Sequence, residues 1–351
     1  MSLSKELREK IQFDILKHIE IINELDVDTV AKKHKVSRQT VYRYLQDFQK
    51  RKIIEELGTG TNKRKQYTVA IQKQKNSYII NNGLSEENIW RRDIKPFCLS
   101  IPQNAYEKVQ YIFLEIMNNA IEHSEGEIIN VVISKSPVRF KMTIEDDGIG
   151  IFQKIQTVFD LPEKSFAILE LAKGKLTTDQ DTHTGEGIFF SSRIADNFDI
   201  ISQELIFTSK FSKNQNMEAR LFQNEQPVSR GTLIVAVIYF DNDTSINEVV
   251  NMFTEHPEHI GFNATHVPVR LLEYGSENPI LVSRSEARRL LSRFERFSRI
   301  TLDFEGVEDI RQGFADEVFR VFPNKHPDCM LEVINCNEKV QAMIAHVKNT
   351  K

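Results

Sequence analysis

The chain has 351 residues, of which 40% are hydrophobic and 27% are charged, and its formal net charge is -4. This length predicts two or three domains, and the apolar fraction argues against wholesale disorder. The longest apolar run, Leu233–Phe240, has the length of a strand and is too short to cross a membrane. The N-terminus lacks the apolar core of a signal peptide. We therefore expect a cytoplasmic protein with no membrane partner.

The basic residues are concentrated near the N-terminus. Residues 1–75 hold 17 Lys and Arg against 10 Asp and Glu, a balance of +7, whereas the rest of the chain has a balance of -11. A basic segment on an acidic body indicates that the segment meets a polyanion.

The predicted elements divide the chain into three units, residues 1–71, 72–243 and 244–351. Together they predict a multidomain α+β protein. The first unit is helical with a β-hairpin, the second has helices on one face of a mixed, mostly antiparallel sheet, and the third is a small α/β unit.

The first unit is predicted to hold three helices and a hairpin. Apolar residues recur at helical spacing in the first two helices, and a serine can cap the third. Two short extended runs then enclose a Gly-rich, basic tip. The helices are expected over Leu3–Ile22, Asp28–His34 and Ser37–Lys50, and the strands over Ile53–Leu57 and Tyr67–Ala70.

The third helix carries polar side chains suited to a DNA groove, because Arg and Gln near a helix start can read base edges there. Basic residues at a hairpin tip can touch phosphate. The phrase VSRQTVYRYL resembles a winged helix-turn-helix domain, which implies double-stranded DNA as a partner. The alternative is a small helical domain whose basic face serves protein contact. The expected DNA contacts are Arg38, Gln39, Thr40 and Arg43 on the helix and Lys63, Arg64 and Lys65 at the tip.

The middle unit begins with a connector and a long helix, Asn104–Ser124. Two strands, a Gly-rich loop, two helices and a second Gly-containing loop follow. The strands are expected over Ile128–Ser134, Phe140–Glu145, Phe198–Ser209, Met217–Phe222 and Gly231–Phe240.

Within that long helix, Glu115 and Asn119 lie one turn apart and therefore on one face. A carboxylate and a carboxamide so placed can align a water and hold a hydrated Mg²⁺, which prefers oxygen ligands. Asn118, Glu122 and His123 are near the same face. The alternative is a solvated polar stripe.

Two glycine motifs follow. The segment Ile144–Ile151 reads IEDDGIGI, so a strand ends in carboxylates and the glycines allow the backbone to approach a ligand. The alternative is an acidic turn that binds no ligand, which could have the same sequence. Farther on, Gly185 and Gly187 directly precede a helix, whose free N–H groups attract phosphate. A lone GxG pair is weak evidence, and no GxxxxGK[ST] loop occurs in the chain.

In this order and spacing the motifs resemble the GHKL ATPase superfamily over residues 100–242. The resemblance implies ATP and Mg²⁺ as cofactors. It implies Glu115 as the general base or water-positioning group, Asn119 as the Mg²⁺ ligand, and Gln153–Thr184 as a mobile lid in which Lys173 or Lys175 reaches phosphate or, more simply, is solvated. The other nucleotide-binding residues it implies are Asn118, His123, Asp146, Gly148, Gly150, Gly185, Gly187 and Thr232, with Asp146 at adenine and Gly185 and Gly187 at the phosphates.

The sequences of two motifs, EIMNNAIEHS and GEGIFFSSRIAD, are most similar to those of the anti-sigma-factor serine kinases. His123 lies in the nucleotide helix itself, and no dimerisation helix pair with a phosphoacceptor histidine precedes it. Histidine autokinase activity is therefore disfavoured.

The third unit alternates strands (Val267–Tyr274, Ile300–Phe304, Met330–Ile334) with helices (Ser283–Phe297, Gln312–Phe322, Asn337–Val347). The run ITLDFEGVEDIRQGFADEVFRVF resembles the strand-loop-helix of STAS domains. The position phosphorylated in that family's antagonists reads Arg311-Gln312-Gly313 here, without a hydroxyl. A contact function is expected, with Asp316 and Arg320 as exposed candidates. The alternative is an unrelated small α/β domain.

Together these features predict an ATP-binding regulator, in which an ATPase module controls a DNA-binding head. The alternative is a protein serine/threonine kinase that acts on a separate partner. A third possibility is a nucleotide sensor without turnover. A protein partner or a homodimer also fits the three-unit organisation.

Overall fold

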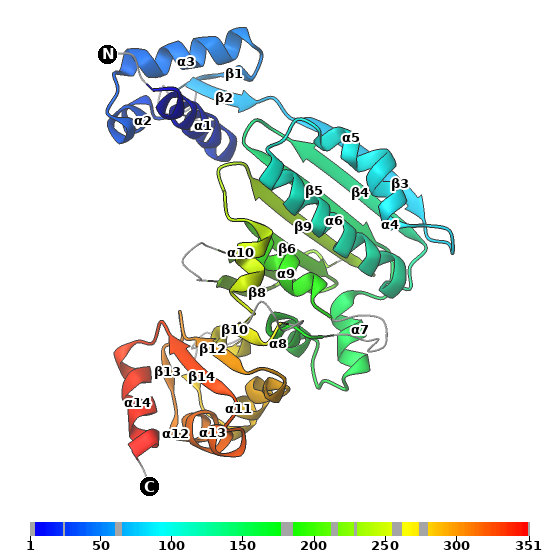
Figure 1. The fold of residues 1–351 in the computed structure, drawn as a ribbon, viewed down its shortest axis with the longest axis vertical. Coiled ribbons are helices and arrows are strands. Elements are labelled where there is room, and N and C mark those ends of the chain that lie inside the picture. The colour runs from blue at the N-terminus through cyan, green and yellow to red at the C-terminus, as the bar shows by residue number, and fades with distance from the viewer. Residues whose placement is uncertain are drawn as a thin grey trace.

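The computed structural model describes residues 4–23, 25–59, 65–176, 185–211, 217–227, 230–254, 262–273 and 280–349. Within these ranges the chain forms a helical N-terminal unit with a hairpin, a large sheet with helices on one face, and a C-terminal unit around a small parallel sheet (Figure 1). In the same ranges no helix is long and apolar enough to span a lipid bilayer. The predicted multidomain α+β class is confirmed.

The N-terminal unit contains the elements that the sequence predicts. Each helix begins at a residue whose side chain accepts a hydrogen bond from the first turn, Ser4, Asp26 and Ser37. Apolar side chains of the three helices and the hairpin form a separate core that includes Ile15, Leu45 and Val69. The elements are α1 (Lys5–Ile22), α2 (Val27–His34), α3 (Arg38–Lys50), β1 (Ile54–Thr59) and β2 (Lys65–Val69).

The central sheet has seven described strands in the order β3-β4-β5-β9-β6-β7-β8, and every neighbouring pair is antiparallel. The sequence run Phe198–Ser209, read as one strand, is a hairpin of two. Alternate residues of β5 are buried, as expected for a sheet with one covered face. The strands are β3 (Gln72–Ile79), β4 (Ile128–Lys135), β5 (Arg139–Asp146), β6 (Asn197–Ser202), β7 (Leu205–Phe211), β8 (Met217–Gln223) and β9 (Thr232–Tyr239).

Helices cover one face of this sheet (Figure 1). The longest, α6, buries an apolar stripe at three- and four-residue spacing that includes Val109, Ile112 and Ile116. The C-terminal half of α6 also faces the nucleotide motifs described below. The helical elements are α4 (Glu86–Ile89), the π-turn η1 (Trp90–Ile94), α5 (Lys95–Cys98), α6 (Gln103–His123), α7 (Ile151–Val158), α8 (Ser165–Lys173), α9 (Gly187–Ile194) and α10 (Ile246–Asn251).

The C-terminal unit is built on three parallel strands in the order β10-β12-β14, with helices between them. The predicted strand Val267–Tyr274 is, as far as Glu273, instead the end of β10 followed by a 3₁₀ helix, and Tyr274 lies outside the described residues. The strands are β10 (Ala264–Pro268), β11 (Ile280–Leu281), β12 (Arg299–Asp303), β13 (Asp309–Ile310) and β14 (Met330–Ile334). The helical elements are η2 (Val269–Glu273), α11 (Arg284–Leu291), η3 (Phe294–Arg296), α12 (Gln312–Asp316), η4 (Glu317–Val321), α13 (Phe322–Lys325) and α14 (Glu338–Asn349).

One expectation for this unit is wrong. Asp316 was expected to be exposed for contact, but it is only 9% exposed. Its carboxylate accepts hydrogen bonds from Arg320 on the same helical run and from Arg284 at the start of α11. Asp316 therefore joins two helices inside the unit, and the exposed part of the pair is Arg320.

The two terminal units meet the central sheet differently. The buried apolar residues of the central sheet, its helices and the C-terminal unit form one continuous cluster. The N-terminal unit keeps a cluster of its own, to which the turn between β4 and β5 contributes Val138. The division after residues 71 and 243 stays a prediction, because packing alone separates only the first unit.

Candidate nucleotide-binding site

A cavity opens between the C-terminal end of α6, the end of β5, the start of β9, and the starts of α7 and α9. Its empty space, including the part open to solvent, is about 1030 Å³. Nine of the ten nucleotide-motif residues predicted from sequence line it: Glu115, Asn118, Asn119, His123, Asp146, Gly150, Gly185, Gly187 and Thr232. The tenth, Gly148, lies beside the cavity and bonds to Asp146.

Asp146 is the last residue of β5 and points to the covered face, because it continues the buried alternation of that strand. Its Oδ1 accepts a hydrogen bond from the Gly148 N–H at 2.9 Å. Burial raises the pKa of Asp146 to about 6, although hydrogen bonds from Gly148 and Thr232 oppose the rise. At neutral pH the side chain is therefore an ionised acceptor at the cavity wall, as an adenine amino group requires.

The neighbouring carboxylate has a different task. Asp147 Oδ1 accepts hydrogen bonds from the N–H groups of Glu127 (2.7 Å) and Ile128 (3.0 Å), which hold the pKa of Asp147 below its ordinary value. It therefore ties the start of β4 to the end of β5. The next residue, Gly148, passes so close to the chain that a Cβ there would lie 1.9 Å from the Ser124 carbonyl oxygen, so a larger residue cannot fit.

Thr232 lies opposite Asp146, at the start of β9. Its hydroxyl oxygen accepts a hydrogen bond from the Ile151 N–H at 2.9 Å. The first residue of α7 is thereby held against the sheet, directly after Gly150. The late Gly-Thr pair thus shapes the loop that follows the Asp146 motif.

On α6, Glu115 and Asn119 face the cavity together, as their spacing predicts. The Asn119 amide donates to the Glu115 carbonyl at 2.8 Å, which orients the amide, and Asn118 donates to Glu122 at 3.3 Å. The Glu115 carboxylate reaches the start of α9, since a Cβ on Gly187 would lie only 2.2 Å from Glu115 Oε2. A carboxylate and the first N–H groups of α9 therefore share one end of the cavity.

Lys154 is a cavity residue that the motifs did not indicate. It lies on α7 and its Nζ donates to the His123 carbonyl at 2.7 Å and to Glu125 at 3.0 Å. Its ammonium therefore bridges the end of α6 and the start of α7. The chain has 46 Lys and Arg residues, and no motif distinguishes Lys154 from the others. The one feature that could have identified it is its position one turn into the helix that follows IGI.

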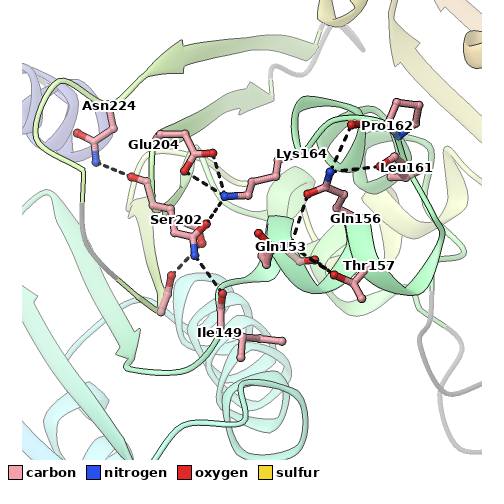
Figure 2. A network of polar contacts seen from close by, with 12 residues as sticks. Ile149, Gln153, Gln156, Thr157, Leu161, Pro162, Lys164, Ser202, Glu204 and Asn224 are labelled. Carbon is pink, nitrogen blue, oxygen red and sulfur yellow. Dashed lines mark hydrogen bonds and ion pairs between the residues drawn. The ribbon is translucent and has the colours of Figure 1, made fainter.

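A polar network holds the loop after β5 from its other side (Figure 2). The Gln203 amide donates to the Ile149 carbonyl at 3.3 Å, and Lys164 Nζ donates to Gln203 at 2.6 Å. Lys164 also pairs with Glu204 at 3.0 Å. The segment between α7 and α8 is therefore fastened to the turn between β6 and β7, which fixes the first half of the predicted lid.

The lid lysines do not occupy the positions expected from sequence. Within Gln153–Thr184, the residues to Leu176 form α7, α8 and the start of the following loop, and residues 177–184 lie outside the described ranges. Lys173 is fully buried, and its Nζ donates to Glu170 and to two carbonyls of the C-terminal unit. Lys175 donates to the Arg296 carbonyl at 2.9 Å. The expectation that the lysine reaches phosphate or solvent is therefore wrong for Lys173, whereas Lys175 is half-buried and bonds the C-terminal unit.

The predicted DNA contacts lie together on the N-terminal unit as far as the structure describes them. Arg38, Gln39 and Arg43 are exposed on α3, and Arg38 pairs with Asp28 at 3.1 Å. The Thr40 hydroxyl is half-buried and hydrogen-bonds Ser37 at the helix start. At the hairpin, Lys65 pairs with Glu56 at 3.0 Å, whereas Lys63 and Arg64 lie outside the described residues.

The residues present fit an adenine nucleotide with Mg²⁺. The Asp146 carboxylate is buried, and the Gly148 N–H holds it in place. It can therefore accept a hydrogen bond from an exocyclic amino group. The start of α9 supplies backbone donors without a Cβ at Gly187, which suits phosphate. The amides of Asn118 and Asn119 supply oxygen, the ligand type that Mg²⁺ prefers.

Two family models match parts of the chain. Residues 104–235 match the histidine kinase-, DNA gyrase B- and HSP90-like ATPase family, and residues 286–341 match a STAS-like domain of unknown function. No curated protein matches the chain. All the predicted nucleotide-motif residues fall inside the first match, and domains of that family bind ATP, usually with Mg²⁺. The chain therefore contains a GHKL-type, ATP-binding domain within residues 104–235 and a STAS-like domain within residues 286–341.

Proposed function

We propose that the protein is an ATP-dependent, DNA-binding transcriptional regulator. The observation that supports it most is the convergence of separate segments, from Glu115 on α6 to Thr232 on β9, on one cavity within the ATPase match. A basic helical head is attached to the same sheet, where Glu20 of α1 pairs with Arg139 of β5. An ATP-binding module in contact with such a head suits regulation of that head.

The main polar groups of the cavity have separate roles in this proposal. The Asp146 carboxylate accepts a hydrogen bond from the adenine amino group, and the N–H groups near Gly185 and Gly187 bind phosphate oxygens. Asn119 holds Mg²⁺ through its amide oxygen, with Asn118 beside it. The metal, when bound, neutralises phosphate charge. Glu115, at the phosphate end of the cavity, orients the attacking water and accepts its proton.

The N-terminal unit serves as a winged helix-turn-helix head. The exposed side chains of Arg38, Gln39 and Arg43 share the outer side of α3, the helix that would enter a major groove. Arg38 forms an ion pair with Asp28, and both side chains are open to solvent. Such an exposed pair is weak, so Arg38 can leave it to contact a phosphate or a guanine.

Two strands connect the cavity with the head. β5 runs from Arg139 to Asp146 and pairs with β9, so that Arg139 lies opposite Tyr239 and Asp146 lies opposite Thr232. At the far end, Arg139 pairs with Glu20 of α1, and Lys17 lies 4.6 Å from the centre of the Tyr239 ring. A shift of these strands at the cavity, about 24 Å away for eight residues, would reach the seat of the head. ATP can favour one arrangement only through contacts that differ between the two.

The central test is titration of the full-length protein with ATP and ADP in the presence of Mg²⁺, followed by measurement of phosphate release. Glu115→Gln should keep nucleotide binding and lose turnover, because the amide cannot accept a proton. Glu107→Gln is the matched control, since Glu107 is exposed on the same helix and bonds Gln103 away from the cavity. Normal turnover in Glu115→Gln would rule out its assigned role.

DNA binding is tested by fluorescence anisotropy with duplex DNA from the protein's own promoter, at several salt concentrations and with or without ATP. Arg38→Ala and Arg43→Ala should weaken binding, and each should lower the salt slope by about one if the side chain contacts phosphate. Lys339→Ala, an exposed charge on α14, is the control. Unchanged binding in both arginine variants would contradict the head's proposed role.

A serine/threonine kinase that acts on a separate partner is the second candidate. It is favoured by the resemblance of the α6 and α9 motif sequences to those of anti-sigma-factor serine kinases. Transfer of labelled phosphate from ATP to another polypeptide would support it. An allosteric regulator releases phosphate to water or keeps it in ATP. The fate of the labelled phosphate therefore separates the two functions.

A further inference from the structure

Helix α8 is a wall of the nucleotide cavity that the C-terminal unit encloses from outside. Leu171, on α8, lines the cavity. Every residue from Ser165 to Lys173 except the partly buried Phe166 is buried, although a surface helix normally keeps a polar face in water. The remaining sides of α8 pack against α7, α9, β10 and η2. Both the cavity and the C-terminal unit therefore depend on the position of this helix.

Lys173, the last residue of α8, caps a helix of the C-terminal unit. Its Nζ donates to the carbonyls of Arg289 (3.0 Å) and Ser292 (2.9 Å), at the end of α11. Its third proton goes to Glu170 Oε1 at 2.6 Å, one turn back on α8. An ammonium has three donors, so all of them are used, and a cation at a helix C-terminus is favoured by the helix dipole.

Arg293 makes the reverse contact from the C-terminal unit. One end of its guanidinium donates to Glu170 Oε2 at 2.8 Å, and the other donates to the Lys175 carbonyl, just beyond the end of α8. Glu170 thus lies between two cations from opposite sides of the boundary, and its side chain is 6% exposed. We call Glu170, Lys173 and Arg293 the α8 clamp, because Lys173 caps the end of α11 and Arg293 bonds Glu170 and the chain just beyond α8.

Arg193 ties a second cavity helix to the same boundary. It lies at the end of α9, whose first residue Gly187 lines the cavity. Its buried guanidinium donates to the carbonyls of Phe189 (3.0 Å), Ala172 (3.0 Å) and His266 (3.2 Å), which belong to α9, α8 and β10. Arg193 therefore joins the two cavity helices directly and ties them to a strand of the C-terminal unit.

We propose that the STAS-like unit positions the wall of the nucleotide cavity in cis, through the α8 clamp, and so sets the rate at which nucleotide leaves. Arg293 is the positioning residue supplied by the C-terminal unit. This inference rests on the proposed occupancy of the cavity by ATP. With the clamp intact, Leu171 and the start of α9 stay at fixed positions around the bound nucleotide. With the clamp broken, α8 loses its bonds to Arg293 and the wall opens more often.

The test compares full-length Arg293→Met with the wild-type protein, using a fluorescent ATP analogue chased with excess ATP. The dissociation rate should rise about tenfold, the factor that corresponds to the loss of one hydrogen bond to a charged group. The matched control is Arg288→Met on α11, the helix that ends just before Arg293. Arg288 pairs with Glu317 inside the C-terminal unit at 3.0 Å and should leave the rate unchanged.

Hydrogen exchange without nucleotide gives a readout that does not depend on binding. Arg293→Met should speed amide exchange in the segments around Leu171 and Ser292 together, whereas Arg288→Met should not affect the former. Arg293→Lys keeps the cation but cannot span from Glu170 to the Lys175 carbonyl, so its dissociation rate should fall between wild type and Arg293→Met. It also replaces the methionine variant if that one does not fold.

The outcomes separate the clamp from the function on which it rests. If the wild-type protein binds no nucleotide, the proposed function fails while the exchange experiment still tests the clamp. If it binds and a folded Arg293→Met protein releases nucleotide at the wild-type rate, the positioning role is overturned. Equal acceleration by Arg288→Met would also overturn it, because the effect would then come from general loosening of α11.

Discussion

The N-terminal and C-terminal units are joined to the ATPase sheet by contacts of different kinds. The N-terminal unit has its own apolar core with Val138 as the sheet's contribution, and its polar contacts include Glu20 with Arg139 and Lys17 with Asp241. The last pair is partly exposed, at 29% and 41% of the two side chains. The C-terminal unit shares one continuous core with the sheet and encloses buried charges.

This difference indicates which unit can move. Opening a contact costs free energy that grows with the apolar surface and the buried bonds it exposes. Detaching the N-terminal unit uncovers Val138 and charges that water can solvate. Detaching the C-terminal unit uncovers α8 and deprives Lys173 of its two carbonyl acceptors. We therefore expect the head to be the movable part and the STAS-like unit to be a fixed part of the nucleotide site.

The largest effect is expected for Glu170→Ala, which leaves Lys173 and Arg293 as buried cations without their shared carboxylate. Removing one partner of a buried pair costs about 3–5 kcal/mol. The single tryptophan, Trp90, packs on Phe113 in the ATPase unit, so its fluorescence during urea unfolding should report the lower stability.

The control for this prediction is Glu87→Ala, which breaks an exposed pair with Arg91 and should cost about 0.5 kcal/mol or less. If the Trp90 transition is the same in Glu170→Ala and wild type, the C-terminal unit unfolds separately. The contrast between the two attachments would then be lost.

Asp146→Asn should weaken ATP binding about 10- to 100-fold. The Gly148 N–H requires an oxygen from residue 146, so an asparagine must turn its NH₂ group towards the adenine amino group, donor against donor. Calorimetric titration measures the change. Asp147→Asn, at a carboxylate that bonds the start of β4 instead, should change affinity far less, and equal losses would refute the adenine contact.

Glu20→Ala should have a smaller effect, confined to the head. Its partner Arg139 is 28% exposed and can be solvated, so the cost is about 1 kcal/mol. Affinity for ATP should stay at the wild-type value, while DNA affinity should lose its dependence on ATP, measured by anisotropy. Glu9→Ala, which breaks an exposed pair with Lys5 on the same helix, should keep that dependence.

The smallest effect is expected from pH. Because the folded pKa of Asp146 is about 6, its carboxylate is partly protonated at pH 5.5, and ATP affinity should fall about fourfold between pH 7.5 and 5.5. Its effect on folding has the opposite sign: the raised pKa means that the native state holds the proton more tightly, so this contribution to stability is full below the ordinary pKa and is lost as the pH rises through 6. Asp146→Asn should remove both dependences, and a persistent affinity change in that variant would assign the effect to ATP.

The local parts of the cavity could be predicted from sequence because each depends on short-range geometry. One helical turn places Glu115 and Asn119 on one face, strand alternation points Asp146 inward, and Gly187 opens a helix. The roles of these residues stay predictions until nucleotide is measured. Lys154 could not be identified in this way, because its place in the cavity comes from the approach of α7 to the end of α6.

By itself, the sequence determined most of the elements, the fold class and the residues that carry the nucleotide motifs, since capping, periodicity and glycine spacing act within a few residues. Only the tertiary structure decided which charges face solvent and which join units. Lys173 and Lys175 read as mobile lid lysines, and Asp316 read as an exposed contact, yet each bonds a distant segment. The physical reason is that burial of a charge depends on partners brought from over 100 residues away for the lysines, such as the carbonyls at the end of α11, and no local pattern encodes that approach.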